Sequence, residues 1–228
     1  MTETIRADIF TLDRDRQAAP QVYEELRRRI ITLQLAPGAP LSRIALMEMF
    51  GVSQTPIRDA LLRLADEKLV DIFAQHATRV SAIDMAQVRQ AQFLRQSVEL
   101  EVVRQLAVQD DHSGLVPIRR DLERQKALLD NGILAPEDER DLTFHKRLCE
   151  AAGVAEIWTL IKIRSGNLDR LRRLLFPKPE RGLSDHLSVL AAIEARDGDE
   201  AQRLLRDHLT RTLSLVDEVR ERHPTYLK

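Results

Sequence analysis

The chain is poor in the residues that mark several classes of protein. It has one cysteine, Cys149, so no disulfide can form within it, and a secreted disulfide-bonded scaffold is excluded. Aromatic residues make up only 4% of the 228 residues, and no apolar run is long enough to cross a bilayer. The opening MTETIRADIF lacks the charged-then-apolar order of a secretory signal. We therefore expect a cytoplasmic protein with no membrane partner.

An excess of charge of one sign is also absent. The 35 Lys and Arg residues offset 36 Asp and Glu residues, which leaves a formal net charge of −1. Residues 20–82 alone contain eight basic and seven acidic side chains. A general polycation is excluded, so any contact with nucleic acid must come from individually placed side chains.

The residues that are present favour helices. Hydrophobic residues reach 43% and charged residues 31%, which is enough for a buried core and a hydrated surface. The 8 Gly and 9 Pro lie mostly between segments of helical periodicity. The length suits a small domain followed by a medium one. We predict a mainly α fold, with a domain at residues 20–82 and an all-helical domain at residues 83–228.

The first segments differ in their periodicity. Residues 1–19 show no apolar face and predict a flexible tail. From Gln21 apolar residues recur at helical spacing, and the helix ends at LAPGAPLS. A second short helix is predicted between Ser42, as its N-cap, and Gly51, as its C-terminal cap.

The stretch GVSQTPIRDALLRLADEKLV predicts a third helix that begins directly after a tight turn. Ser53 suits its N-cap and Pro56 its first turn. Two short helices joined in this way are typical of a helix-turn-helix, whose second helix presents its first residues to the DNA major groove. The predicted inward-facing residues are Ile57, Leu61, Leu62 and Leu64, and the predicted exposed ones are Gln54, Thr55 and Arg58.

Two short β-prone runs, LVDIFA and TRVSAI, follow this helix and predict a hairpin wing. Gln75, His76 and Ala77 separate them. Capped helices also occur in any small helical domain, in which Arg58 would be an ordinary solvated charge. The order of three helices and a hairpin favours the DNA-binding interpretation.

The stretch PGAPLSRIALMEMFGVSQTPIRDALLRLADEKLV, with the wing after it, resembles the winged helix-turn-helix of the GntR family of bacterial transcription regulators. The resemblance covers residues 20–82 and implies that the third helix reads DNA. The positions that it implies for DNA contact are Arg43, Ser53, Gln54, Thr55, Arg58 and His76.

Two positions depart from the family pattern. Gln54 stands where the family usually has a basic residue, which should change the base preference because Gln pairs well with adenine and Arg with guanine. Ala77 stands where the tip of the wing is often Gly, which leaves His76 as the best candidate for a minor-groove contact.

Residues 84–221 predict about six helices in antiparallel pairs, which is an all-α bundle. Asp84 suits the N-cap of a long first helix. Breaks are expected at DDHSGLVP, NGILAPEDE and FPKPERGLSD. The predicted core-facing residues of the first helix are Val88, Phe93, Leu94, Val98 and Val102.

Four possible metal ligands lie in this half. Asp141 and His145 are four residues apart and so share one helical face, while His186 and His208 lie among apolar residues of later helices. A buried imidazole needs a partner, because its burial without one is costly. The four side chains could converge on a divalent metal. Alternatively, each histidine is satisfied separately by a carbonyl or a surface carboxylate.

The segments FLRQSVELEVVRQLA, DLTFHKRLCEAAG and DHLSVLAAIEARDGDEAQRLLRDHL resemble the FadR-type effector domain, called FCD. The resemblance implies that Asp141, His145, His186 and His208 bind a metal. It also implies that Arg95 reaches the ligand cavity, with Arg164 and Asn167 as further lining residues. We expect zinc, with nickel or manganese as alternatives.

These observations predict a DNA-binding transcription regulator, and a repressor rather than an activator. It would be a homodimer that binds palindromic double-stranded operator DNA and a small carboxylate effector. We expect no enzymatic activity. The alternatives are a metal-dependent enzyme acting on small organic acids, and a helical adaptor whose histidines are structural.

Overall fold

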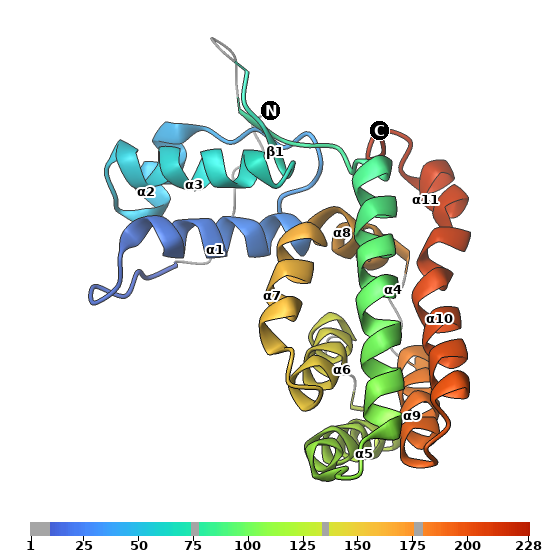
Figure 1. The fold of residues 1–228 in the computed structure, drawn as a ribbon. Coiled ribbons are helices and arrows are strands. Elements are labelled where there is room, and N and C mark those ends of the chain that lie inside the picture. The colour runs from blue at the N-terminus through green and yellow to red at the C-terminus, as the bar shows by residue number, and fades with distance from the viewer. Residues whose placement is uncertain (1–9, 74–77, 134–136, 176–179) are drawn as a thin grey trace. The chain divides into compact units, whose positions relative to one another are not determined.

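The structure of the chain is a computed structural model that describes residues 10–73, 78–133, 137–175 and 180–228. The chain forms two compact units. The first contains residues up to Met85 together with residues 223–228, and the second contains residues 86–222. Figure 1 shows the ribbon of both units.

The first unit is a winged helix-turn-helix, as predicted. Its elements are α1 (Ala18–Ile31), α2 (Arg43–Phe50), α3 (Gln54–Asp66), β1 (Val70–Asp71) and β2 (Arg79–Val80). The two strands pair antiparallel, with Val70 opposite Val80. The Ser42 hydroxyl accepts a hydrogen bond from the backbone N–H of Ala45 at 3.4 Å, and Gly51 adopts the left-handed φ of 63° that ends α2. Ser53 occupies the N-cap position of α3 but makes no side-chain cap bond there.

The core of this unit lies where α1 packs against α3. Ile57, Leu61 and Leu64 are fully buried on the inward face of α3. The prediction that Leu62 also faces inward is wrong, because its side chain is 46% exposed. One residue advances a helix by about 100°, which turns Leu62 away from Leu61 and towards the solvent face that carries Arg58.

The predicted tail of residues 1–19 falls partly outside the described residues, which begin at Phe10. From Phe10 onward the chain makes contacts. The Phe10 ring packs edge-on against Phe50, with 5.6 Å between the ring centroids. The Gln21 side chain accepts a hydrogen bond from the backbone N–H of Asp13 and donates one to the Asp13 carbonyl. Residues 10–17 are therefore fastened to the first unit, which a free tail would not be.

The last residues return to the first unit. The Lys228 N–H donates to the Ile83 carbonyl at 2.9 Å, and the Met85 N–H donates to the Lys228 carbonyl at 3.0 Å. Ile83 and Leu227 form an isolated parallel bridge. The predicted helical domain of residues 83–228 includes residues 223–228, because backbone pairing of this kind has no signal in the side-chain pattern.

The second unit is an all-α bundle. Its described elements are α4 (Met85–Val108), a 3₁₀ turn (Ser113–Leu115), α5 (Val116–Asp130), α6 (Glu137–Ala151), α7 (Ala155–Arg164), α8 (Gly166–Leu175), α9 (Glu180–Glu194), α10 (Gly198–Ser214) and α11 (Val216–Arg222). The described residues thus contain two more α-helices than the six expected. Breaks that the sequence does not predict fall at residues 152–154, at Ser165 and at Leu215, where no proline marks them.

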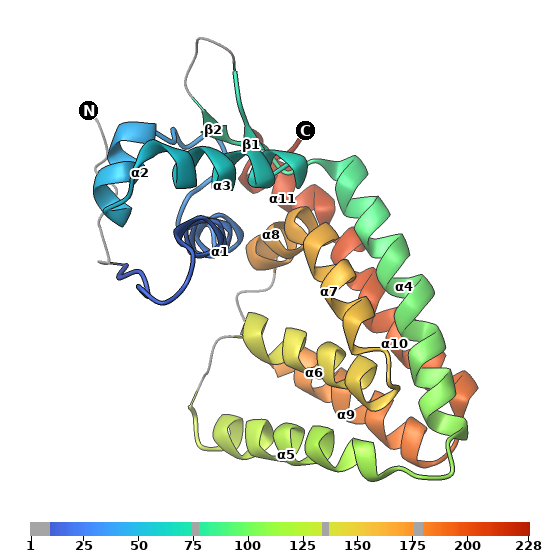
Figure 2. The ribbon, with the colours of Figure 1, turned by 60° about the vertical axis from the view of Figure 1, so that its left-hand side comes forward.

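The helices α4 and α10 run side by side in both ribbon views (Figures 1 and 2). Two glutamines join them. The Gln92 amide donates to the Leu209 carbonyl at 2.7 Å, and the Gln202 amide donates to the Leu100 carbonyl at 3.0 Å. A tight turn at residues 195–197 joins α9 to α10, which pack as an antiparallel pair.

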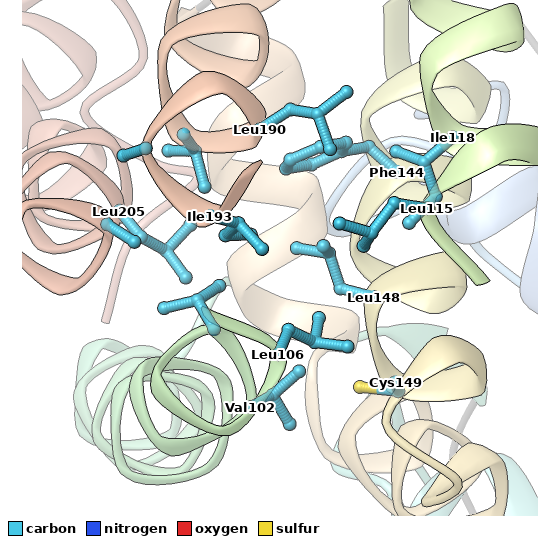
Figure 3. Packing of buried hydrophobic residues seen from close by; sticks show 14 of the residues in the cluster. Val102, Leu106, Leu115, Ile118, Phe144, Leu148, Cys149, Leu190, Ile193 and Leu205 are labelled. Carbon is cyan, nitrogen blue, oxygen red and sulfur yellow. The ribbon is translucent and has the colours of Figure 1, made fainter. Parts of the chain in front are cut away.

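The apolar core of the second unit gathers side chains from α4, α6, α9 and α10, with the 3₁₀ turn and α5 (Figure 3). Leu106, Phe144, Leu148 and Ile193 are fully or almost fully buried in it. The prediction that Phe93 faces this core is wrong, because Phe93 is 73% exposed. Among the described helices, none is both long and apolar enough to span a bilayer.

Adjacent leucines on α3 allow a paired test of this packing. Leu61 is 1% exposed and Leu62 is 46% exposed. Leu61→Ala should lower the free energy of unfolding by about 2–5 kcal/mol, because it leaves a cavity in a close-packed core. Leu62→Ala should cost less than about 1 kcal/mol. Urea unfolding of the two variants measures the difference, and equal losses would contradict the assigned orientation of α3.

Candidate functional site

Four polar side chains converge inside the second unit. Asp141 and His145 come from α6, His186 from α9 and His208 from α10. All four are buried, and one potential ligand atom from each lies within 4.8 Å of the others. The sequence predicts these residues as ligands, and the structure brings them together.

The distances within this cluster centre on the Asp141 carboxylate. Its oxygens lie 3.6 Å from Nε2 of His145, 3.5 Å from Nε2 of His186 and 3.5 Å from Nε2 of His208. The Nε2 atoms of His186 and His208 are 3.3 Å apart. Each histidine therefore turns the same ring nitrogen towards the shared point.

The apolar core sets the orientation of these rings. Phe144, next to His145 on α6, stacks on the His186 ring with 4.0 Å between centroids. The His145 ring lies nearly parallel to Trp158 of α7, with 6.3 Å between centroids. Because interiors are close-packed, such contacts leave the imidazoles few alternative rotamers.

A ring of charged side chains surrounds the cluster. Oε2 of Glu99 lies 2.5 Å from Nδ1 of His145, and Oδ2 of Asp185 lies 3.0 Å from Nδ1 of His208. Nη2 of Arg172 lies 2.7 Å from Oδ2 of Asp141. Asp185 is hydrogen-bonded to Nδ1 of His208, which is the arrangement that orients metal-binding histidines, while Glu99 lies close to Nδ1 of His145 without a hydrogen bond.

Burial and these neighbours act on the charges of the cluster in opposite directions. Burial lowers the pKa of His186 to about 3, so this imidazole is neutral. Burial disfavours the charged form of Asp141, but Arg172 and His145 outweigh it and hold the pKa of Asp141 well below its usual range. Burial likewise opposes a charge on His208, yet hydrogen bonds to Asp141 and Asp185 raise its pKa.

These residues suit a divalent cation. Nε2 of His145 is fully buried and has no hydrogen-bond partner among the described residues. A buried polar atom without a partner is costly, and a cation at the shared point would satisfy it. Three imidazole nitrogens with one carboxylate oxygen are ligands that zinc, nickel and manganese accept.

The three predicted effector-binding residues lie in different environments. Arg95 on α4 is 2% exposed, and its Nε donates to Oε1 of Glu99 at 2.7 Å, while its Nη2 has no hydrogen-bond partner in the described part of the chain. Asn167 on α8 is buried and accepts a hydrogen bond from Nη2 of Arg170 at 2.6 Å. Arg164, in the last turn of α7, is exposed.

The residues predicted for DNA contact lie on the surface of the first unit. Arg43 is exposed at the start of α2, and Ser53 is exposed directly before α3. Gln54, Thr55 and Arg58 are exposed in the first turns of α3. His76 lies outside the described residues, as do residues 74, 75 and 77.

Sequence reasoning missed Glu99, Arg172 and Asp185. The first had a signal, because Arg95 and Glu99 are four residues apart and so share one face of a helix. Asp185 directly precedes His186 but serves His208 on the next helix, which only the tertiary structure shows. Arg172 had no signal in the sequence.

Two protein-family models match the chain, one over the winged helix-turn-helix and one over the helical bundle. The model of bacterial regulatory proteins of the gntR family matches residues 18–80, and the FCD domain model matches residues 90–211. The HTH-type transcriptional repressor RspR of Escherichia coli K12 is 33% identical over 204 residues, which are 88% of this chain and 90% of that protein.

Two further similarities extend over most of the chain. An uncharacterised HTH-type transcriptional regulator of Streptomyces ambofaciens is 35% identical over 207 residues, with 89% of this chain and 86% of that protein covered. The solved structure of E. coli McbR/YncC has the same fold, with a TM-score of 0.68 at 20% identity over 89% of this chain and 98% of that one. The chain thus belongs to the GntR family, as a DNA-binding transcription regulator with an FCD domain.

Proposed function

We propose that this regulator is a repressor whose affinity for its operator is controlled by a divalent metal and a small carboxylate, both bound in the helical unit. The convergence of Asp141, His145, His186 and His208 beside a buried arginine is the observation that carries this proposal. The most direct experiment measures whether metal binding depends on these four residues.

In the proposed site Asp141 and the three histidines hold the metal through one carboxylate oxygen and three Nε2 atoms. When bound, the cation supplies a Lewis-acidic position to which an effector carboxylate can bind. The proposed metal is zinc, with nickel and manganese as alternatives. Arg172 engages Oδ2 of Asp141 at 2.7 Å, while Oδ1, 3.5 Å from Nε2 of His186 and of His208, faces the shared point where a metal would bind.

Arg95 is the proposed anchor for the effector. A guanidinium pairs with carboxylates at short distance and stays charged at every physiological pH. Glu99 occupies only the Nε of Arg95, so Nη2 remains to bind an anion. Asn167 is a second proposed lining residue, since it is buried, whereas the exposure of Arg164 makes it the weakest of the three.

On the DNA side, Gln54, Thr55 and Arg58 are proposed to read base edges, with Arg43 and Ser53 on the phosphate backbone. His76 is retained as a proposed minor-groove contact. We also propose a homodimer, because paired recognition helices read the two halves of a palindrome. The half-sites should lie roughly 34–36 Å apart, which is one turn of the duplex.

A ligand alters DNA binding only through a difference in its affinity for two conformations. The effector-bound form must therefore disfavour the separation of recognition helices that the operator requires. The relative RspR is a repressor of transcription, which supports repression here. That the relatives are regulators argues against the metal-dependent enzyme and the helical adaptor.

The metal site can be tested through stability. Zinc at about 100 times its Kd should raise the free energy of unfolding by roughly 2.7 kcal/mol, because it binds the folded chain alone. His186→Ala should abolish this increment and lower the zinc content found by elemental analysis. His112→Ala is the matched control, because His112 lies in the same unit and its Nε2 contacts the Leu106 carbonyl. An undiminished zinc response in His186→Ala would reject the ligand set.

The recognition helix can be tested with DNA selected by the full chain from a random duplex pool. Arg58→Ala should weaken binding to the selected site by about 1–3 kcal/mol and relax one base position. Arg120→Ala removes the same charge from an exposed position on α5 and should leave affinity unchanged. Unchanged affinity of Arg58→Ala, or a salt slope near zero, would contradict the proposed interface.

A further inference from the structure

A short backbone pairing joins the last residues of the chain to the residues at the start of α4. The N–H of Ile83 donates to the Tyr226 carbonyl at 2.7 Å, and the N–H of Lys228 donates to the Ile83 carbonyl at 2.9 Å. These are successive hydrogen bonds of a parallel ladder. We call the two paired segments, residues 83–85 and residues 226–228, the clasp.

The clasp is held by these backbone bonds and by side chains near the surface. Nζ of Lys228 lies 3.8 Å from Oδ1 of Asp71 on β1, and the two side chains are 47% and 41% exposed. Ile83 is fully buried, but Tyr226 and Leu227 are only half-buried. Because it buries little apolar surface, a pairing of this kind can open and close again without unfolding of the rest of the chain.

The clasp lies where the backbone passes between the two units. The backbone passes once after Met85 and once before His223, since residues 223–228 belong to the first unit. Two passages that are hydrogen-bonded to each other leave the chain fewer conformations than a single passage does. The state of the clasp therefore affects the conformational freedom of the connection between the units.

The helices that lead away from the clasp carry the proposed site. Arg95 lies on α4, which begins at the clasp, and His208 lies on α10, which leads through α11 to the second passage. The amide of Gln92 on α4 donates to the carbonyl of Leu209, the residue after His208, at 2.7 Å. A shift of His208 towards a bound cation would therefore act on the spacing of α4 and α10.

We infer that the clasp couples the helical unit to DNA binding. Occupancy of the metal site changes the spacing of α4 and α10, this change favours the open or the closed clasp, and the state of the clasp sets the affinity for the operator. A palindrome is read only when both recognition helices lie at the half-site separation, so affinity falls when the connection has more conformations to lose. The inference rests on the proposed function, because it supplies the route by which that site controls the operator.

The ratio of the operator Kd values with and without zinc tests this inference. The unaltered 228-residue chain selects duplexes from a random pool under both conditions, and fluorescence anisotropy gives the Kd of each protein for the best duplex. A chain that ends at Thr225 lacks one side of the clasp. We expect zinc to change the Kd about fivefold or more for the unaltered chain, and less than about twofold for the shortened chain.

Two substitutions of Lys228 form a matched pair within the full chain. Lys228→Pro removes the N–H that donates to Ile83, whereas Lys228→Ala removes the same side chain, with its contact to Asp71, and keeps that N–H. Lys228→Pro should lower the zinc-dependent ratio, and Lys228→Ala should retain the ratio of the unaltered chain. If the shortened chain binds neither zinc nor DNA, this pair decides. Equal ratios for Lys228→Pro and Lys228→Ala, or an undiminished ratio in a shortened chain that binds both, would overturn the inference.

The outcomes separate the role of the clasp from the function on which it rests. If zinc leaves the Kd of the unaltered chain unchanged, the metal does not control the operator, and both proposals fail. If zinc changes the Kd equally in the unaltered chain and in the clasp variants, the proposed function stands and the role of the clasp is rejected. A clasp that only stabilised the fold would alter both Kd values together and leave their ratio unchanged.

Discussion

The burial of charge within an apolar bundle is the constraint on which the helical unit depends. Asp141, Glu99, Arg95 and three imidazoles are withdrawn from water, although such groups are expensive to bury without partners. Each is held by another: Glu99 by Arg95 and His145, and Asp141 by Arg172 and the histidines. Apolar residues of similar volume could stabilise the bundle equally well at these positions, which supports the binding role proposed for this cluster.

The two units use helices differently: the first presents polar side chains at its surface, and the second holds them in its interior. In the first unit, α3 buries Ile57, Leu61 and Leu64 and leaves its first turns exposed, so that Gln54, Thr55 and Arg58 are free to contact DNA. In the second unit, the proposed metal ligands point inward and the apolar core surrounds them. Close packing matters in both units, because it fixes the geometry of side chains that are proposed to contact a ligand.

Interactions between residues close in the sequence determine much of this organisation, so it could be predicted. The caps at Ser42 and Gly51 act within a few residues, so the helix-turn-helix could be predicted, and the helical spacing of Asp141 and His145 placed both on one face. The exposure of Leu62 and Phe93 could not be predicted, because a hydrophobic residue does not show whether a neighbouring helix covers it. The role of Asp185 depends on how α9 pairs with α10, and the return of residues 223–228 depends on backbone bonds, neither of which a single sequence displays.

X-ray absorption at the zinc edge shows which atoms coordinate the metal, and so whether the four converging side chains are its ligands. The 228-residue chain loaded with one equivalent of zinc should show scattering from three imidazole rings and additional oxygen ligands, with no sulfur. A spectrum with fewer than three imidazoles, or with zinc bound through Cys149, would show that Asp141 and the three histidines do not form the metal site.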